Sequence, residues 1–343
     1  MAFTTINKST SFQNQLLWTG TGATNARTGL GFQPDFCWGK ERSSTSGSIL
    51  QDSVQGLSVY LASNSNSGTS PTSVQFTSFD SDGFTLGTST GINQSGQTNV
   101  GWAWKANGAG SANADGSITT TATSVDTTSK FSIIKWTGDG TGGSSIGHGL
   151  GVKPEFVIIK RLEGSQSWYV WNQALGDNYL ELDTTTTSAS GGLTVSTSTI
   201  TFPNSWSIYN ASGEAMICYA FAPVRGYSRF GGYTGNSSTD GAFVYLGFKP
   251  SFLIIKRSDN TSSWHMWDNK REDYNGNPND TAQRADNSGA ESDSTDYSID
   301  FLSNGFKVRN ASDLAGADGG TYIYMAFAEH PFVSSEGVPC TAR

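Results

Sequence analysis

The chain repeats one pattern of residues three times along its 343 positions. Each copy opens on an aromatic-Thr-Gly turn, and a Gly-x-x-Pro-x-Phe segment then leads into an apolar strand with a basic end. The turns begin at Trp18, Trp136 and Tyr233, the prolines are Pro34, Pro154 and Pro250, and the basic ends are at Lys40, Lys160 and Lys256. Self-similarity of this kind indicates that one structural unit is present three times.

The copies stay in phase beyond the proline. Another strand is expected 14 residues after it in each copy, and each copy closes on an alanine between two large apolar residues. The closing alanines are Ala103, Ala220 and Ala326. The residues on either side of each alanine share one face of a strand, because side chains alternate along it. We interpret these flanking residues as core rather than as a binding surface.

The repeats also set the expected domain organisation. We predict an all-β fold of three tandem β-sandwich domains with lectin-like architecture, because turn signals separate short strands at intervals of about 8–12 residues. The segments are an N-terminal arm (1–15), three repeats (16–106, 131–224 and 225–332), a linker (107–130) and a C-terminal tail (333–343). The 41 glycines and 12% aromatic residues agree with turns and strands. Short helical patterns occur only in 52–61 and 269–273.

Two strands, Phe156–Ile159 and Phe252–Ile255, are apolar on both faces. A strand that is buried on both sides needs a second covering layer. In a sandwich, that layer must come from a neighbouring copy or subunit. We therefore predict inter-domain or subunit contacts at Ile158, Ile159, Ile254 and Ile255.

Copies two and three each carry two tryptophans in the strand that follows. Trp168 and Trp171 are an odd number of residues apart, as are Trp264 and Trp267. In a regular strand, such residues point to opposite faces. We expect one of each pair in the core and the other outside or at an interface. All four are candidate surface or receptor contacts.

The stretch 268–296 is rich in Asp, Asn and Glu and is expected to form a long solvated loop. Loops of this length often serve recognition, so Asp273, Tyr274 and Asn275 are further candidate receptor contacts. Oxygen ligands at alternating positions suit calcium, but the EF-hand pattern is missing. Cys37 and Cys218 are expected to be free, buried thiols. No cysteine and histidine cluster indicates zinc, so neither a metal nor a cofactor is predicted.

Two short motifs are typical of enzymes. Gly143–Gly147 fits GxSxG, but the glycine-rich residues that follow cannot begin the helix that a nucleophile elbow needs. Gly138–Gly143 fits GxGxxG, but no βαβ unit surrounds it. Paired carboxylates for glycoside hydrolysis stay open as an alternative, because their spacing is spatial. We predict that the chain is not an enzyme.

The net charge of −8 and the missing basic patch exclude nucleic acid as a partner. No apolar run approaches the roughly 20 residues of a membrane helix, so no membrane insertion is expected. The composition is typical of extracellular proteins, yet residues 1–8 lack a signal-peptide pattern. A virion protein, assembled in the host cytoplasm and acting outside the cell, reconciles the two observations.

Four segments of the third copy carry a family resemblance: Tyr233–Pro250, Phe252–Trp267, Ile299–Phe306 and Gly320–Phe327. They resemble a family of virion structural proteins of marine tailed phages, including cyanophages, and the resemblance covers nearly the whole chain. It implies a tail-fibre, capsid-decoration or vertex protein, and it supplies no catalytic residue. The expected partners are other virion proteins, copies of the chain in a trimer, and a host receptor or surface glycan. The alternative is a glycan-binding, lectin-like adhesion module.

Overall fold

The computed structural model describes residues 4–204, 209–271, 277–333 and 336–338. The regular structure of these residues is β-strand in antiparallel sheets, so the all-β prediction is confirmed. The exceptions are three short turns of 3-10 helix: η1 (Ser9–Ser11), η2 (Gln173–Leu175) and η4 (Thr295–Tyr297). The described residues of 52–61 and 269–273 form strand ends and turns instead of helix.

Copy one forms a four-stranded sheet in the order β1-β9-β3-β4, a three-stranded sheet β2-β8-β7 and a pair β5-β6. The strands are β1 (Gln13–Thr19), β2 (Asn25–Thr28), β3 (Phe36–Glu41), β4 (Ile49–Asp52), β5 (Val59–Tyr60), β6 (Ser70–Pro71), β7 (Phe76–Asp80), β8 (Gly83–Leu86) and β9 (Thr98–Trp104). A hydrophobic cluster of its own, including Trp18, Phe76 and Phe84, fills the space between the two main sheets.

Copy two forms a seven-stranded sheet in the order β10-β11-β19-β13-β14-β15-β16 and a three-stranded sheet β12-β18-β17. The strands are β10 (Ala122–Asp126), β11 (Phe131–Thr137), β12 (Ser145–Gly147), β13 (Phe156–Arg161), β14 (Tyr169–Asn172), β15 (Asn178–Glu181), β16 (Ala189–Ser190), β17 (Thr194–Val195), β18 (Thr199–Thr201) and β19 (Ala215–Phe221). Strand β10 comes from the expected linker, so part of 107–130 belongs to this sheet.

Copy three forms a six-stranded sheet in the order β20-β28-β22-β23-β24-β25 and a three-stranded sheet β21-β27-β26. The strands are β20 (Ser228–Thr234), β21 (Phe243–Tyr245), β22 (Phe248–Arg257), β23 (His265–Asp268), β24 (Thr281–Arg284), β25 (Ser292–Asp293), β26 (Ile299–Leu302), β27 (Gly305–Val308) and β28 (Thr321–Pro331). Copies two and three also have a hydrophobic cluster each between their two sheets.

The order and register of the strands are the same in the three copies. The closing strand β9 lies between β1 and β3, β19 lies between β11 and β13, and β28 lies between β20 and β22. The phenylalanine after the proline pairs with an aromatic residue of the closing strand: Phe36 with Trp104, Phe156 with Phe221 and Phe252 with Phe327. The regions around the three prolines therefore occupy equivalent places.

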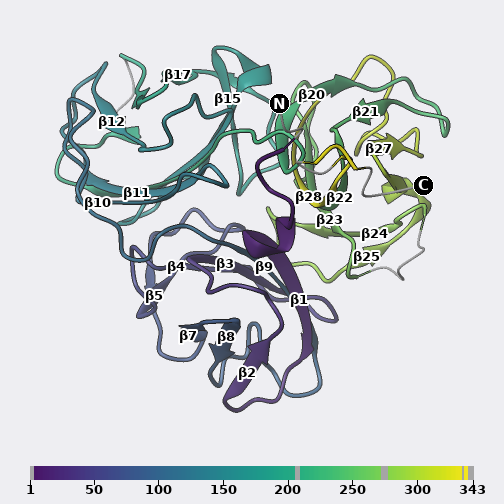
Figure 1. Ribbon diagram of the computed structural model, residues 1–343, viewed down its shortest axis with the longest axis horizontal. Coiled ribbons are helices and arrows are strands. Elements are labelled where there is room, and N and C mark those ends of the chain that lie inside the picture. Colours follow the sequence, from purple (N-terminus) through teal and green to yellow (C-terminus); the bar gives the residue numbers. More distant parts are fainter. Residues whose placement is uncertain (1–3, 205–208, 272–276, 334–335, 339–343) are drawn as a thin grey trace.

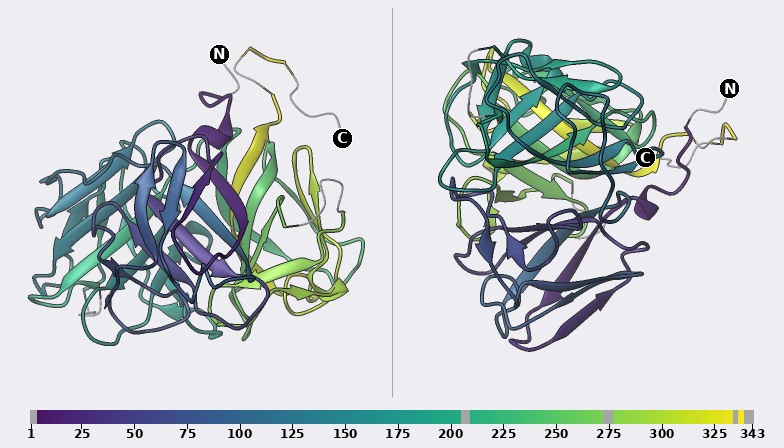
Figure 2. Two further views of the ribbon diagram at one scale, coloured as in Figure 1. Left: turned by 90° about the horizontal axis from the view of Figure 1, so that it is seen from below. Right: turned by 90° about the vertical axis from the view of Figure 1, so that its left-hand side faces the viewer.

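The three copies form three lobes around a common centre (Figure 1). The large sheets face this centre, and the three-stranded sheets lie on the outside (Figure 1). A fourth hydrophobic cluster contains residues of all three copies. The short turn η1 of the N-terminal arm packs against β28, so the first and last parts of the chain lie side by side (Figure 2). The copies thus share one core in addition to keeping one each.

Candidate functional site at the junction of the three repeats

Three equivalent aromatic residues meet at the centre of the molecule. Trp104, Phe221 and Phe327 each follow the closing alanine of their copy directly, and none is more than 2% exposed. The ring centroids of Trp104 and Phe221 lie 6.4 Å apart, those of Trp104 and Phe327 5.8 Å, and those of Phe221 and Phe327 5.9 Å. All three pairs pack edge to face, a favoured arrangement of aromatic rings. The near-equal distances place a pseudo-threefold axis through this aromatic triangle.

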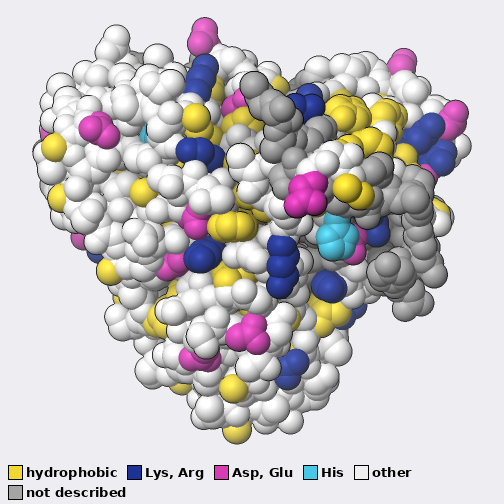
Figure 3. Space-filling model, viewed as in Figure 1, with side chains coloured by type: hydrophobic (Ala, Val, Ile, Leu, Met, Phe, Trp, Pro, Cys, Tyr) yellow, Lys and Arg dark blue, Asp and Glu magenta, His cyan; other side chains and the backbone are white. Residues whose placement is uncertain are grey.

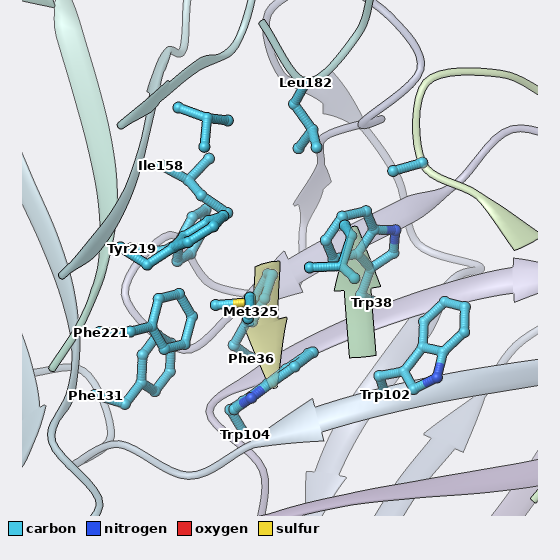
Figure 4. Close-up of a cluster of buried hydrophobic side chains, with 14 of the residues drawn as sticks. Phe36, Trp38, Trp102, Trp104, Phe131, Ile158, Leu182, Tyr219, Phe221 and Met325 are labelled. Carbon is cyan, nitrogen blue, oxygen red and sulfur yellow. The ribbon is translucent and has the colours of Figure 1, made fainter. Parts of the chain in front are cut away.

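Figure 4 shows Trp104 and Phe221 among the residues that surround the axis. Phe131 stacks on Phe221 at a centroid distance of 4.5 Å, and Met325 of copy three reaches into the same space (Figure 4). The prediction that the residues flanking the closing alanines are core is confirmed, since these side chains are buried.

The strands that are apolar on both faces separate this centre from the cluster of their own copy. Ile158 and Ile254 belong to the shared cluster, where the copies meet. Ile159 and Ile255 pack instead in the clusters of copies two and three. The predicted inter-domain or subunit role is therefore wrong for Ile159 and Ile255, because successive side chains of a strand point to opposite faces.

A buried carboxylate accepts a hydrogen bond across two of the three junctions. Tyr219 of copy two donates its hydroxyl to Asp52 of copy one over 2.8 Å. Trp102 of copy one donates its indole N–H to Asp268 of copy three over 3.0 Å. Burial raises the pKa of Asp52, although the hydrogen bonds it accepts act in the other direction. A carboxylate away from water is unfavourable unless it accepts hydrogen bonds, so the donor from the neighbouring copy helps to stabilise the buried group.

At the third junction, between copies two and three, other residues replace both the carboxylate and its side-chain donor. Asn172 stands at the register position of the two carboxylates, and Met325 stands at that of the two donors. Methionine offers no N–H or O–H group. Asn172 Nδ2 donates instead to the backbone carbonyl of Tyr324 over 3.4 Å. A carboxylate thus occurs only where the opposing copy supplies a donor.

Each copy also buries a lysine at the end of the strand that follows its proline. Lys40, Lys160 and Lys256 are almost completely covered, and burial lowers the pKa of each to about 8. Each ammonium group donates to a backbone carbonyl of a neighbouring copy: Lys40 to Asn287 (2.9 Å), Lys160 to Asn66 (2.8 Å) and Lys256 to Thr185 (3.4 Å).

These lysine bonds join the copies in a closed ring. Copy one bonds to copy three, copy three to copy two, and copy two to copy one. Backbone hydrogen bonds run beside them in the same directions: Ser46 N–H to Ser288 O, Gln166 N–H to Asn66 O and Ser262 N–H to Thr185 O. Sequence reasoning missed this role, although the recurrence of lysine at one position of three strands was a visible signal.

The prediction that the four tryptophans are surface contacts was wrong, since they are between 0 and 4% exposed. Trp168 and Trp264 lie at the junctions. Trp168 Nε1 donates to the backbone carbonyl of Ala62 in copy one over 3.0 Å, and Trp264 Nε1 to that of Glu181 in copy two over 2.8 Å. The outer face of their strand is covered by a neighbouring copy instead of by water.

The other two tryptophans point to the opposite face, as their odd spacing requires. Trp171 belongs to the cluster of copy two and donates its indole N–H to the carbonyl of Gly176 over 2.9 Å. Trp267 belongs to the cluster of copy three and donates to the carbonyl of Tyr297 over 3.0 Å. Both serve the core of their own copy.

The loop candidates Asp273, Tyr274 and Asn275 lie outside the described residues. Within the described ranges, no group of three or more His, Cys, Asp or Glu side chains is arranged to hold a metal ion. The same part of the chain contains no helix with the length and apolar character needed to cross a membrane. Cys37 and Cys218 are buried free thiols, as predicted, and burial raises the pKa of both.

One protein-family model, described as a domain of unknown function (DUF7483), matches residues 8–331. No curated protein and no solved structure matches the chain. The matched range runs through all three copies, as does the shared core.

Proposed function

We propose that this chain, which belongs to the DUF7483 family, is a non-catalytic structural protein of a phage particle. Its place is the surface of the virion, as a tail-fibre or capsid-decoration protein. It contacts other virion proteins and, in that position, the host receptor.

The junction of the three copies is the observation that carries this proposal. Aromatic and ionisable side chains that often serve binding or catalysis elsewhere are placed inside the molecule, where they hold the copies together. The aromatic triangle, the buried carboxylates and the lysine ring all serve this closure. A chain that uses these groups to hold a closed three-lobed body together suits a mechanical and scaffolding role. Fixed side chains in a packed interior also favour a rigid body.

We further propose that each copy is a lectin-like β-sandwich, whose two layers are the large sheet and the three-stranded sheet. The hydrophobic cluster between them supports this assignment, because two facing sheets with an apolar space between them are typical of a sandwich. The trimer of chains stays a prediction. In that trimer the outer faces of the lobes make the contacts, because the threefold arrangement inside one chain already uses the inner faces.

Purified particles of the phage that encodes the chain test this function. Mass spectrometry of intact, nuclease-treated and density-purified particles is expected to detect the chain in many copies. Antibodies raised against the purified protein are expected to label the particle surface in electron micrographs. A chain that is expressed during infection but is missing from particles contradicts the proposal, and turnover of host polysaccharide by the purified protein contradicts the non-catalytic role.

The glycan-binding alternative loses the tryptophans on which it was based, since none of the four is available to a sugar ring. Receptor contact therefore requires a different surface.

A further inference from the structure

A cleft of about 640 Å³ lies at the junction between copies two and three. Glu155 and Gln173 line it from copy two, and Arg229, Tyr245 and Tyr324 line it from copy three. Its volume falls within the range of about 300–1,000 Å³ that is usual for small-molecule sites. The junction that lacks the buried carboxylate and its donor is thus the one that carries this cleft.

Strand β21, at the side of the cleft, presents two exposed aromatic rings. Phe243 is 48% exposed and Tyr245 is 47% exposed, whereas Val244 between them is buried in the cluster of copy three. Alternation along the strand therefore puts both rings on the outer face, roughly 7 Å apart. Hydrophobic side chains gather on the surface over β21 and β27 (Figure 3). Nearly all other aromatic side chains described above are buried, so this pair is an exception that needs a reason.

The polar groups of the cleft lie beside Tyr245. The guanidinium of Arg229 lies 5.9 Å from the centre of the Tyr245 ring. Gln173 Nε2 approaches the backbone carbonyl of Phe230 at 3.4 Å. Burial raises the pKa of Glu155, while a hydrogen bond from Gln173 acts in the other direction. Glu155 and Arg229 form no ion pair with any described residue. Each has a side-chain hydrogen-bond partner, Gln173 for Glu155 and Tyr324 for Arg229, and a carboxylate and a guanidinium both have further positions for a ligand.

The repeat shows that the fold does not need these side chains. At the register position of Tyr245, copy one has Thr28 and copy two has Gly147. At the position of Arg229, the other copies have Asn14 and Ser132. The same strands form with small, uncharged residues at these places, so the aromatic and charged residues of the cleft serve something other than folding.

The counterparts of Glu155 in the other two copies also differ from it in what they bind. Its counterpart in copy one, Asp35, accepts the backbone N–H groups of Ala106 and Gly108 over 2.7 and 2.8 Å. Its counterpart in copy three, Ser251, donates to Gln13 over 3.1 Å. Asp35 thus binds backbone groups at the end of its own copy and Ser251 bonds to copy one, whereas Glu155 lines the cleft.

We propose that this cleft binds a saccharide, with one face of a sugar ring against Tyr245 and the sugar hydroxyl groups bonded to Arg229, Glu155 and Gln173. Hydroxyl groups both donate and accept, so they suit a site that combines an acceptor carboxylate, a donor guanidinium and an amide that does both. An exposed tyrosine ring supplies the apolar surface. A phosphorylated ligand fits less well, because Glu155 repels it from the same cleft.

The test uses the purified full-length protein on an array of neutral and uronic-acid oligosaccharides, followed by titration calorimetry with the best-binding compound. We expect Tyr245→Ala and Arg229→Ala each to weaken binding at least about tenfold, the size of one lost stacking or charged contact. Tyr245→Phe keeps the ring and is expected to retain most of the affinity. Thr28→Ala, at the matching exposed position of copy one, is the control and is expected to change nothing.

Tyr245 and Arg229 are exposed, so these variants are expected to unfold at the wild-type temperature, which calorimetry of the free protein checks. An array without binding overturns the saccharide site, as does binding that is equal in wild type, Tyr245→Ala and Arg229→Ala. Neither result affects the proposed place on the virion, which the particle experiments test separately.

Discussion

The hydrogen bond between Tyr219 and Asp52 can be tested with a replacement that the chain itself provides. The third junction holds Asn172 and Met325 at the equivalent places. The double variant Asp52→Asn with Tyr219→Met therefore copies a natural solution from one junction to another. We expect it to be less destabilised than the sum of the two single variants.

The magnitudes follow from the contacts of Asp52. Removing the Tyr219 hydroxyl takes away one of the donors to a fully buried carboxylate, and a hydrogen bond to a charged group contributes about 1.5–3 kcal/mol. In the Tyr219→Met variant, Asp52 keeps the backbone N–H groups of Val54 and Gln55 and the side-chain amide of Gln55 as donors. The loss of the hydrogen bond should therefore cost a free energy near the lower end of this range, to which the change in packing is added. Groups in direct contact typically couple by about 0.5–3 kcal/mol. We expect a coupling of at least about 1 kcal/mol, in the direction that favours the double variant.

Guanidinium denaturation at pH 7, followed by tryptophan fluorescence, gives the free energy of unfolding for wild type, both single variants and the double variant. Tyr245→Phe removes the same hydroxyl from an exposed ring and is expected to stay within about 0.5 kcal/mol of wild type. Single-variant losses that simply add in the double variant refute the reasoning, because the carboxylate would then not depend on the donor from copy two.

Three further predictions concern the shared core and the buried ionisable groups. Phe327→Ala removes one ring of the aromatic triangle and should cost about 3–5 kcal/mol, in a single calorimetric transition of the whole chain; a transition confined to part of the chain contradicts a shared core. The free energy of unfolding should rise between about pH 8 and about pH 9.5, because the native chain has released lysine protons that the unfolded chain still binds. Lys160→Met should reduce this slope in denaturant titrations across that range, and an unchanged slope excludes Lys160 as a source. Cys37 and Cys218 should react with a thiol reagent only on unfolding, because the native thiols are buried with raised pKa values; fast labelling of the native chain would show that they are reachable.

The repeated turns and prolines made the strand positions predictable, because the same local chemistry marks the same place three times. The burial on both faces of Phe156–Ile159 predicted a covering layer, and the structure places Ile158 in the shared cluster. The pattern could not show which of two successive isoleucines faces the neighbour. Both residues are equally apolar, and only the packing of the sheets decides the direction.

The tryptophans show why the site was harder to predict than the strands. Odd spacing puts Trp264 and Trp267 on opposite faces, but it does not say whether the second face meets water or protein. Here it meets copy two, so the indole N–H of Trp264 finds a backbone carbonyl there. The cleft around Tyr245 joins residues that are far apart in the sequence, such as Glu155 and Arg229, so no local spacing marks it.

Closing three copies around Trp104, Phe221 and Phe327 within one chain has a consequence that an assembly of identical chains does not share. In a homotrimer, every substitution appears at all three junctions simultaneously, so one junction cannot differ from the others. With the copies in tandem, a change of sequence alters a single lobe and leaves its two neighbours as they were. Such a body can keep the stiffness of a trimer while one of its faces alone adapts to a new partner.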